Sequence, residues 1–302
     1  MIGGYAAPMR RLALLLTALL AACASAFAEP QDCPPAGYDR ARLEALREAG
    51  WAIASVQERR AFALALPRCL ASSDPFLRDA VAFEGLARML RSGQLDQGAQ
   101  NALIVEVLPR LESREPGGFE ASFAALTLSE LVRAERINSH FTDDMRADVL
   151  DRSIQYFQGV RDYRGFDAQE GWRHGVAHGA DLLMQLALNE SLGREDLLRI
   201  RDAIATQVAP EEHFYIYGES ARLARVISAI AHRGLITEDE WTQWFARFPS
   251  SGEDVYASQA GLAWRHNTLA FLQAVWFNAR SSEETADDAV LPGVEAALRA
   301  MP

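Results

Sequence analysis

Apolar residues recur at spacings of three and four along most of the chain, the periodicity of helices with one buried face. The segment after residue 73 also carries boundary signals: Asp74 as N-cap, Pro75 in the first turn and Gly93 as a stop. No stretch alternates with a period of two for long enough to predict a sheet. We therefore predict an all-α fold with helices within 41–54, 57–71 and 75–92, and over 97–111, 119–136, 142–158, 171–188, 194–207, 219–233, 237–246 and 258–278.

The predicted loops are short, which favours antiparallel pairing of consecutive helices. The segment "DPFLRDAVAFEGLARML" resembles one helical hairpin of a HEAT-like repeat, although no strict period of about 40 residues follows it. We predict a single domain over 29–302, built as a curved HEAT-like array or as an α/α ring. The polar, acidic segment 281–290 is predicted to be a loop before a short final helix.

The N-terminal segment is typical of a secretory signal. Arg10 and Arg11 precede a short apolar run and then small residues, and the run is shorter than the roughly 20 residues of a membrane span. Cleavage after Ala28 predicts a signal peptide over 1–28. Alternatively, the stretch ending in Cys23 resembles a lipobox, and only a lipidated Cys23 would attach the protein to a membrane. Both alternatives predict export to a periplasmic or extracellular location, with no transmembrane span.

The remaining cysteines, Cys33 and Cys69, form one even pair. In an oxidising compartment such a pair favours a disulfide, and we predict that bond.

Charge excludes one class of partner. The formal net charge is −11, and nucleic-acid binding requires a basic face. We therefore predict no nucleic-acid partner.

The segment "GWRHGVAHGADLLMQLA" carries the most specific chemical pattern. On a helical wheel His178, Asp181 and Gln185 share a narrow strip with His174, while Gly171, Gly175 and Gly179 form a flank for a close helix contact. Histidines four residues apart can bind one metal ion, and a carboxylate three residues on can complete or orient the set. We predict His174, His178 and Asp181 as candidate ligands of a divalent metal such as zinc. A structural or solvated polar seam and a metal-free binding site are the alternatives.

Neighbouring segments supply further polar groups. Asp162 and Arg164 lie in the loop before this segment, and Glu219 and Arg222 lie one turn apart at a helix start. These four are our candidate catalytic residues. Their alternative roles are a loop-fixing ion pair and a favourable charge at a helix N-terminus. Asp167 and Glu170 are predicted to form a helix-capping box.

Three stretches, "SSDPFLRDAVAFEGLARML", "DYRGFDAQEGWRHGVAHGADLL" and "YGESARLARVI", resemble the bacterial family known as domain of unknown function 2785. The resemblance covers about residues 60 to 250, and the pattern G-W-x-H-x-x-A-H-x-A-D is its most specific part. It implies a helical fold and no assigned activity. It also makes motif positions of Asp162, Arg164, Gly165, Trp172, His174, His178, Asp181, Glu219 and Arg222.

The sequence leaves two functions open. The first is metal-assisted hydrolysis in a polar pocket, with Glu219 or Asp162 as the general base. The second is a non-catalytic helical-repeat scaffold that binds a peptide, a protein or an envelope component.

Overall fold

A computed structural model describes residues 32–210, 212–249 and 254–302. The predicted signal peptide and Cys23 lie outside these ranges. The predicted all-α class is confirmed, because the described chain is helical apart from one two-stranded hairpin, β1 (Phe166–Asp167) and β2 (Gly171–Trp172). The α-helices are α1 (Arg40–Glu48), α2 (Val56–Ala65), α3 (Glu84–Arg91), α4 (Gln97–Val107), α5 (Glu120–Ile137), α6 (Asp143–Gly159), α7 (Gly175–Ala187), α8 (Arg194–Ala205), α9 (Glu219–His232), α10 (Glu238–Phe245), α11 (Gln259–Ser281) and α12 (Leu291–Ala300).

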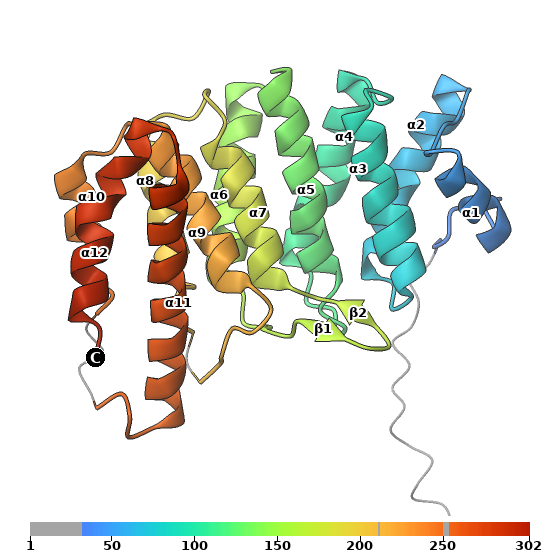
Figure 1. The fold of residues 1–302 in the computed structure, drawn as a ribbon. Helices are drawn as coiled ribbons and strands as arrows, with labels where there is room; N and C mark the ends of the chain where they lie inside the picture. The colour runs from blue at the N-terminus through green and yellow to red at the C-terminus, as the bar shows by residue number, and fades with distance from the viewer. Residues whose placement is uncertain (1–31, 211, 250–253) are drawn as a thin grey trace, which may run out of the picture.

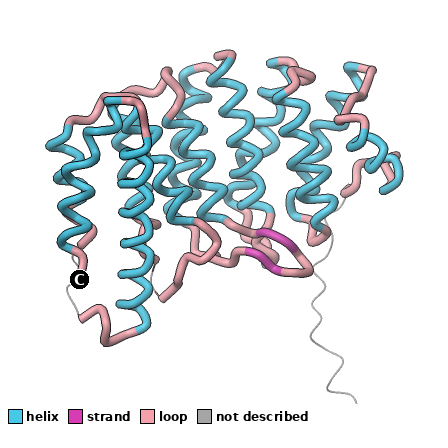
Figure 2. Tube along the Cα trace, in the orientation of Figure 1, coloured by secondary structure: helices cyan, strands magenta, loops and turns pink. Residues whose placement is uncertain are grey.

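The helices stand side by side in an open row, with α1 and α12 at opposite ends (Figure 1). Helix α5 packs on α3 and α7, and α9 packs on α7 and α11, so these alternate helices form one layer. Helices α4, α6 and α8 pack behind them. The row is not closed, so the predicted α/α ring is not formed. Figure 2 shows the β-hairpin at one edge of the row, beyond the ends of the helices.

Fully buried aliphatic side chains from neighbouring helices form the core, among them Leu128 of α5, Leu183 of α7 and Ile227 of α9. Burying each such side chain contributes roughly 1.5–3 kcal/mol, which is why the predicted apolar periodicity holds for most helices. No helix in the described ranges combines the length and hydropathy of a membrane-spanning segment.

Irregular turns interrupt several predicted helices. The 3₁₀ helices η1 (Leu66–Ala71) and η3 (Leu108–Glu112) each follow an α-helix where a proline enters the chain, because proline removes a backbone donor. The prediction for 41–54 is too long, since Trp51 adopts a φ of 62° and α1 ends before it. A π-helix, η2 (Phe76–Phe83), precedes α3. The predicted loop 281–290 contains a 3₁₀ helix, η4 (Thr285–Val290).

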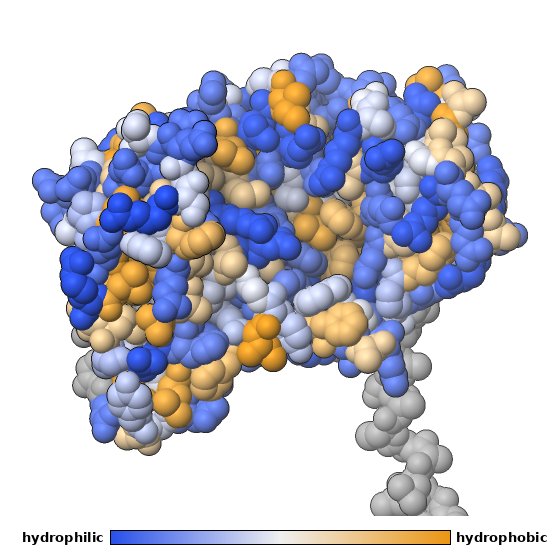
Figure 3. All heavy atoms as spheres, viewed as in Figure 1, coloured by the Kyte–Doolittle hydropathy of each residue, from blue (hydrophilic) through white to orange (hydrophobic). Residues whose placement is uncertain are grey.

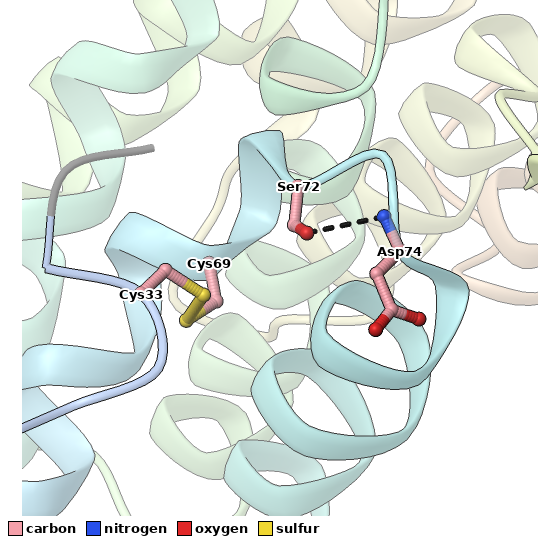
Figure 4. The surroundings of a disulfide bond; sticks show 4 residues. All are labelled: Cys33, Cys69, Ser72 and Asp74. Carbon is pink, nitrogen blue, oxygen red and sulfur yellow. Dashed lines mark hydrogen bonds between the residues drawn. A yellow bond between two sulfur atoms is a disulfide. The ribbon is translucent and has the colours of Figure 1, made fainter. Parts of the chain in front are cut away.

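The predicted disulfide between Cys33 and Cys69 is confirmed (Figure 4). It joins the segment before α1 to η1, with Cα atoms 5.3 Å apart across 36 positions of sequence. Cys69 is fully buried in the core. The bond therefore attaches an otherwise short, exposed segment to the first helices of the row.

Replacement of Cys33 by serine should lower the free energy of unfolding by about 2–4 kcal/mol, because the open loop regains chain entropy in the unfolded state. Urea unfolding of the oxidised protein measures this loss. The reduced wild type is the matched control and should lose the same amount. Equal stability of the oxidised and reduced wild type would contradict a stabilising bond.

The contact between α6 and α7 generates a second prediction. A Cβ on Gly179 would lie 2.8 Å from Cδ2 of Phe157 and 3.1 Å from Cε1 of Tyr156, and Phe157 is fully buried. Gly179→Ala should therefore cost about 1–3 kcal/mol through overpacking, although alanine favours helices. Gly159→Ala is the matched control, because nothing lies within 4 Å of its Cβ position. Equal melting temperatures for the two variants would show that α6 and α7 do not pack tightly here.

Candidate functional site

The hairpin replaces the beginning of the predicted helix 171–188. Phe166 pairs with Trp172 in antiparallel register, and Gly171 has a φ of +77°, which a glycine adopts without strain. The Asp167 carboxylate accepts hydrogen bonds from the backbone N–H groups of Gln169 and Glu170, each at 2.8 Å. Asp167 therefore stabilises the hairpin turn, and the predicted helix-capping box with Glu170 was wrong.

His174 lies at the N-cap of α7 in the left-handed region, at φ 56° and ψ 38°. Its backbone N–H donates to the Arg164 carbonyl at 3.1 Å, and the N–H of Arg173 donates to Gly165 at 3.0 Å. The helical wheel therefore holds for His178, Asp181 and Gln185, which lie in α7, but not for His174, which precedes it. A left-handed non-glycine residue costs about 1–3 kcal/mol and clusters at functional sites.

A cavity of about 500 Å³ opens beside this segment, between the N-terminal ends of α5 and α7 and the loop after α6. That volume lies within the usual range for small-molecule sites. Two of the predicted catalytic residues line it, Asp162 and Arg164. Its remaining charged and polar lining comes from residues that the sequence did not single out: Ser113, Arg114, Glu115, Ser122, Tyr156, Arg161 and Arg173.

Asp162 and Arg164 bind each other and fix the loop. Arg164 Nε lies 2.8 Å from Asp162 Oδ1, and Arg164 Nη2 donates to the Gly117 carbonyl at 3.1 Å. Burial alone would raise the pKa of Asp162, but hydrogen bonds from Arg164 outweigh it and lower that pKa. The carboxylate is therefore ionised at neutral pH and already paired.

The charge of the cavity is opposite in sign to that of the whole protein. Arg114, Arg161, Arg164 and Arg173 line it against two carboxylates, those of Glu115 and Asp162, and Arg173 is also paired with Glu170, which is not part of the lining. The formal net charge of the chain is −11. Low-dielectric walls strengthen such a local field, so the cavity favours anions.

Ser122, Tyr156 and His178 form a polar group at the inner wall of this cavity. The Ser122 hydroxyl donates to the Arg173 carbonyl, and its oxygen lies 2.8 Å from Nδ1 of His178. Because the single hydroxyl proton points to the carbonyl, His178 Nδ1 is the donor in its contact with Ser122. The pair therefore fastens the Arg173–His174 turn to α5 and does not have the geometry of a base that activates a nucleophile.

His178 is neutral in this position. Burial, with a smaller contribution from the nearby His174 and Arg222, lowers its pKa to about 3. Tyr156 donates from its hydroxyl to the Gly175 carbonyl at 3.2 Å. The contact of His178 with Ser122 gives this histidine a structural role, because it joins α7 to α5.

His174 and Glu219 form a separate buried pair on the other side of the turn. Nε2 of His174 lies 3.7 Å from Oε1 of Glu219, beyond hydrogen-bond distance. The other Glu219 oxygen accepts the Tyr217 backbone N–H at 2.9 Å. Trp172 stacks on the His174 imidazole with ring centroids 4.8 Å apart. Burial lowers the pKa of His174 to about 4, so this imidazole is also neutral at pH 7.

The three predicted metal ligands are not brought together. Asp181 pairs with Arg222 of α9, and His178 Nδ1 is occupied by Ser122. The described ranges contain no group of three His, Cys, Asp or Glu side chains placed to hold a metal ion. The rings of His174 and His178 do lie 5.7 Å apart, but no third ligand among the described residues joins them, so the metal site stays a prediction.

The neutral histidines predict a pH dependence of stability. The unfolded chain binds a proton on His178 near pH 6.5, whereas the folded chain binds it only near pH 3. The stabilisation is therefore complete above pH 6.5 and is lost as pH falls, by up to about 1.4 kcal/mol per pH unit. His178→Gln should flatten the slope of unfolding free energy between pH 7 and 5. His232→Gln, which removes an exposed imidazole, is the matched control. A slope in His178→Gln as steep as in this control would contradict a buried, neutral His178.

Comparison with known proteins identifies the family. No curated protein and no solved structure matches the chain. A family model described as "Protein of unknown function (DUF2785)" matches residues 109–277, more than half of the 302 residues. The match includes the hairpin, the cavity and the histidine segment, and it begins after the π-helix stretch that the sequence resemblance included. The chain belongs to this family of proteins of unknown function.

Proposed function

We propose that the protein binds a small anionic molecule, a carboxylate or a phosphate, in the cavity between α5, α7 and the loop after α6. The observation that carries the proposal is the arrangement of four arginines around about 500 Å³ of open space in a chain of net charge −11. Arginine forks match the two oxygens of a carboxylate or phosphate.

Two of these arginines retain capacity for a ligand. The Arg114 side chain is exposed and makes no hydrogen bond or ion pair within the described ranges. Arg161 donates there only from Nη1, to the carbonyls of Gln158 and Val160. In addition, α7 has no side-chain cap, and its first residue, Gly175, lines the cavity. The positive end of this helix dipole adds to the same field.

The geometry favours binding of the anion without a catalysed reaction over hydrolysis. The carboxylate of Asp162 is paired with Arg164, and Glu219 does not line the cavity. Catalytic roles for Asp162, Arg164, Glu219 and Arg222 stay predictions, and no step is assigned to a metal.

We further infer that the protein acts outside the cytoplasm. The secretory pattern of residues 1–28 and the Cys33–Cys69 disulfide support this location. If Cys23 is lipidated instead of removed with a signal peptide, the lipid would attach the protein to a membrane. The open two-layer row of helices supports a HEAT-like array.

A ligand that binds the cavity should raise the melting temperature of the protein, since a ligand at one hundred times its Kd adds about 2.7 kcal/mol of stability. We would titrate inorganic phosphate and succinate at constant ionic strength. The double variant Arg114→Ala/Arg161→Ala should lose the shift, measured against its own melting temperature in buffer alone. Arg299→Ala, an exposed arginine of α12, is the matched control.

The result that contradicts the proposal is a shift of equal size in the double variant. Absence of a shift with both anions in wild type, together with no co-purified small molecule in native mass spectra, would also reject it.

A further inference from the structure

A second cationic surface lies on the layer formed by α3, α5, α7 and α9, away from the cavity. We call it the arginine band and define it by Arg91, Arg133, Arg136, Arg222 and Arg225. Figure 3 shows strongly hydrophilic residues gathered in the middle of this face, with hydrophobic residues beside them. The cavity does not use any of these five side chains.

Side-chain bonds between neighbouring helices show that the band is continuous. Arg91 of α3 binds Glu130 of α5, with Nε 2.8 Å from Oε2. Arg136 of α5 reaches Gln185 of α7 at 3.4 Å. Asp181 of α7 then pairs with Arg222 of α9. The band thus crosses four helices in order.

The band has an excess of positive charge. Two of its five arginines are paired with carboxylates, Arg91 with Glu130 and Arg222 with Asp181. Arg133 and Arg225 lie one turn beyond these ion pairs and have no hydrogen bond or ion pair among the described residues. The Arg91 side chain is 56% exposed although it is paired. Positive groups therefore remain available to a partner, on a chain whose net charge is −11.

A groove adjoins one end of the band. A cavity of about 710 Å³ lies between α3, α4 and α5, with Arg91 and Arg133 in its lining. Ile137 provides an apolar surface in that lining and is 61% exposed, whereas Leu90 and Leu95 are buried. The lining also contains the Asp96 carboxylate, which accepts the Ala99 backbone N–H at 2.7 Å and caps α4. A partner that fits the groove carries an apolar side chain next to negative charge.

We propose that the arginine band is a docking surface for an acidic peptide segment of a partner protein, with an apolar residue of that segment in the groove. Adjacent helices lie about 8–10 Å apart, so the band spans roughly 30 Å and matches an extended chain of about nine residues. Electrostatic complementarity of this kind sets specificity and association rate.

Charge distribution favours a short acidic peptide over a long polyanion. Glu130 and Asp181 interrupt the band, and the surrounding protein is acidic. A nucleic acid or an anionic glycan would therefore meet repulsion as soon as it extended past the band. A peptide can place its carboxylates at the arginines and uncharged residues between them.

The experiment measures fluorescence anisotropy of a labelled nonapeptide, Glu-Leu-Glu-Glu-Leu-Glu-Glu-Leu-Glu, with the full chain at two salt concentrations. Wild type should bind with an affinity that falls at least fivefold from 50 to 200 mM salt. The double variant Arg133→Glu/Arg225→Glu should bind at least tenfold more weakly, and a cooperative thermal transition of this variant alone checks that it is folded. Arg299→Glu is the matched control and should bind like wild type.

Three outcomes would overturn the proposal: no binding of the nonapeptide by wild type, binding retained by the double variant, or binding of heparin or single-stranded DNA that displaces the peptide. The same double variant should keep its phosphate or succinate response. A failure of peptide binding at the arginine band can therefore be distinguished from a failure of anion binding in the cavity.

Discussion

The guanidinium of Arg78 is fully buried, and the rest of the site depends on how it is paired. Its three nitrogens donate to the Asp79 carboxylate at 2.7 Å and to the carbonyls of Ser72 at 3.0 Å and Glu170 at 2.6 Å. The guanidinium carbon also lies 4.0 Å from the centre of the Phe119 ring. A buried charge is tolerated only with this degree of pairing. Because Glu170 belongs to the hairpin and Asp79 to the π-helix, one side chain holds the first helices against the segment that lines the cavity.

A second guanidinium uses the same aromatic ring. Arg173 lies 4.3 Å from the centre of Phe119 and donates from Nε to the Gly117 carbonyl at 2.7 Å. The ring thus separates a structural arginine from one that lines the cavity. Arg164 and Arg173 are held by hydrogen bonds before any ligand arrives, so a ligand would not bear the cost of ordering these two side chains.

Most helices were predictable from the sequence, because each buries one apolar face and its apolar residues therefore recur at spacings of three and four. The hairpin was not, since two-residue strands carry no period. Its signals were single residues, Gly171 and His174, which adopt a positive φ. The histidine spacing of four predicted a shared helical face, but that inference holds only if both residues are helical. Ser122 and Tyr156 were missed because each is one polar residue on an amphipathic helix, and only the fold brings them to the cavity.

The cavity and the arginine band lie at opposite ends of the same two helices. Ser122 and Gly175 stand in the first turns of α5 and α7, whereas Arg136 and Gln185 stand near their C-terminal ends. Transmission between such sites requires an element with two stable arrangements. Here fully buried leucines, Leu128 of α5 and Leu183 of α7, and the close approach of Gly179 to Phe157 of α6 pack both helices along their length. We therefore expect a small anion and an acidic peptide to bind independently.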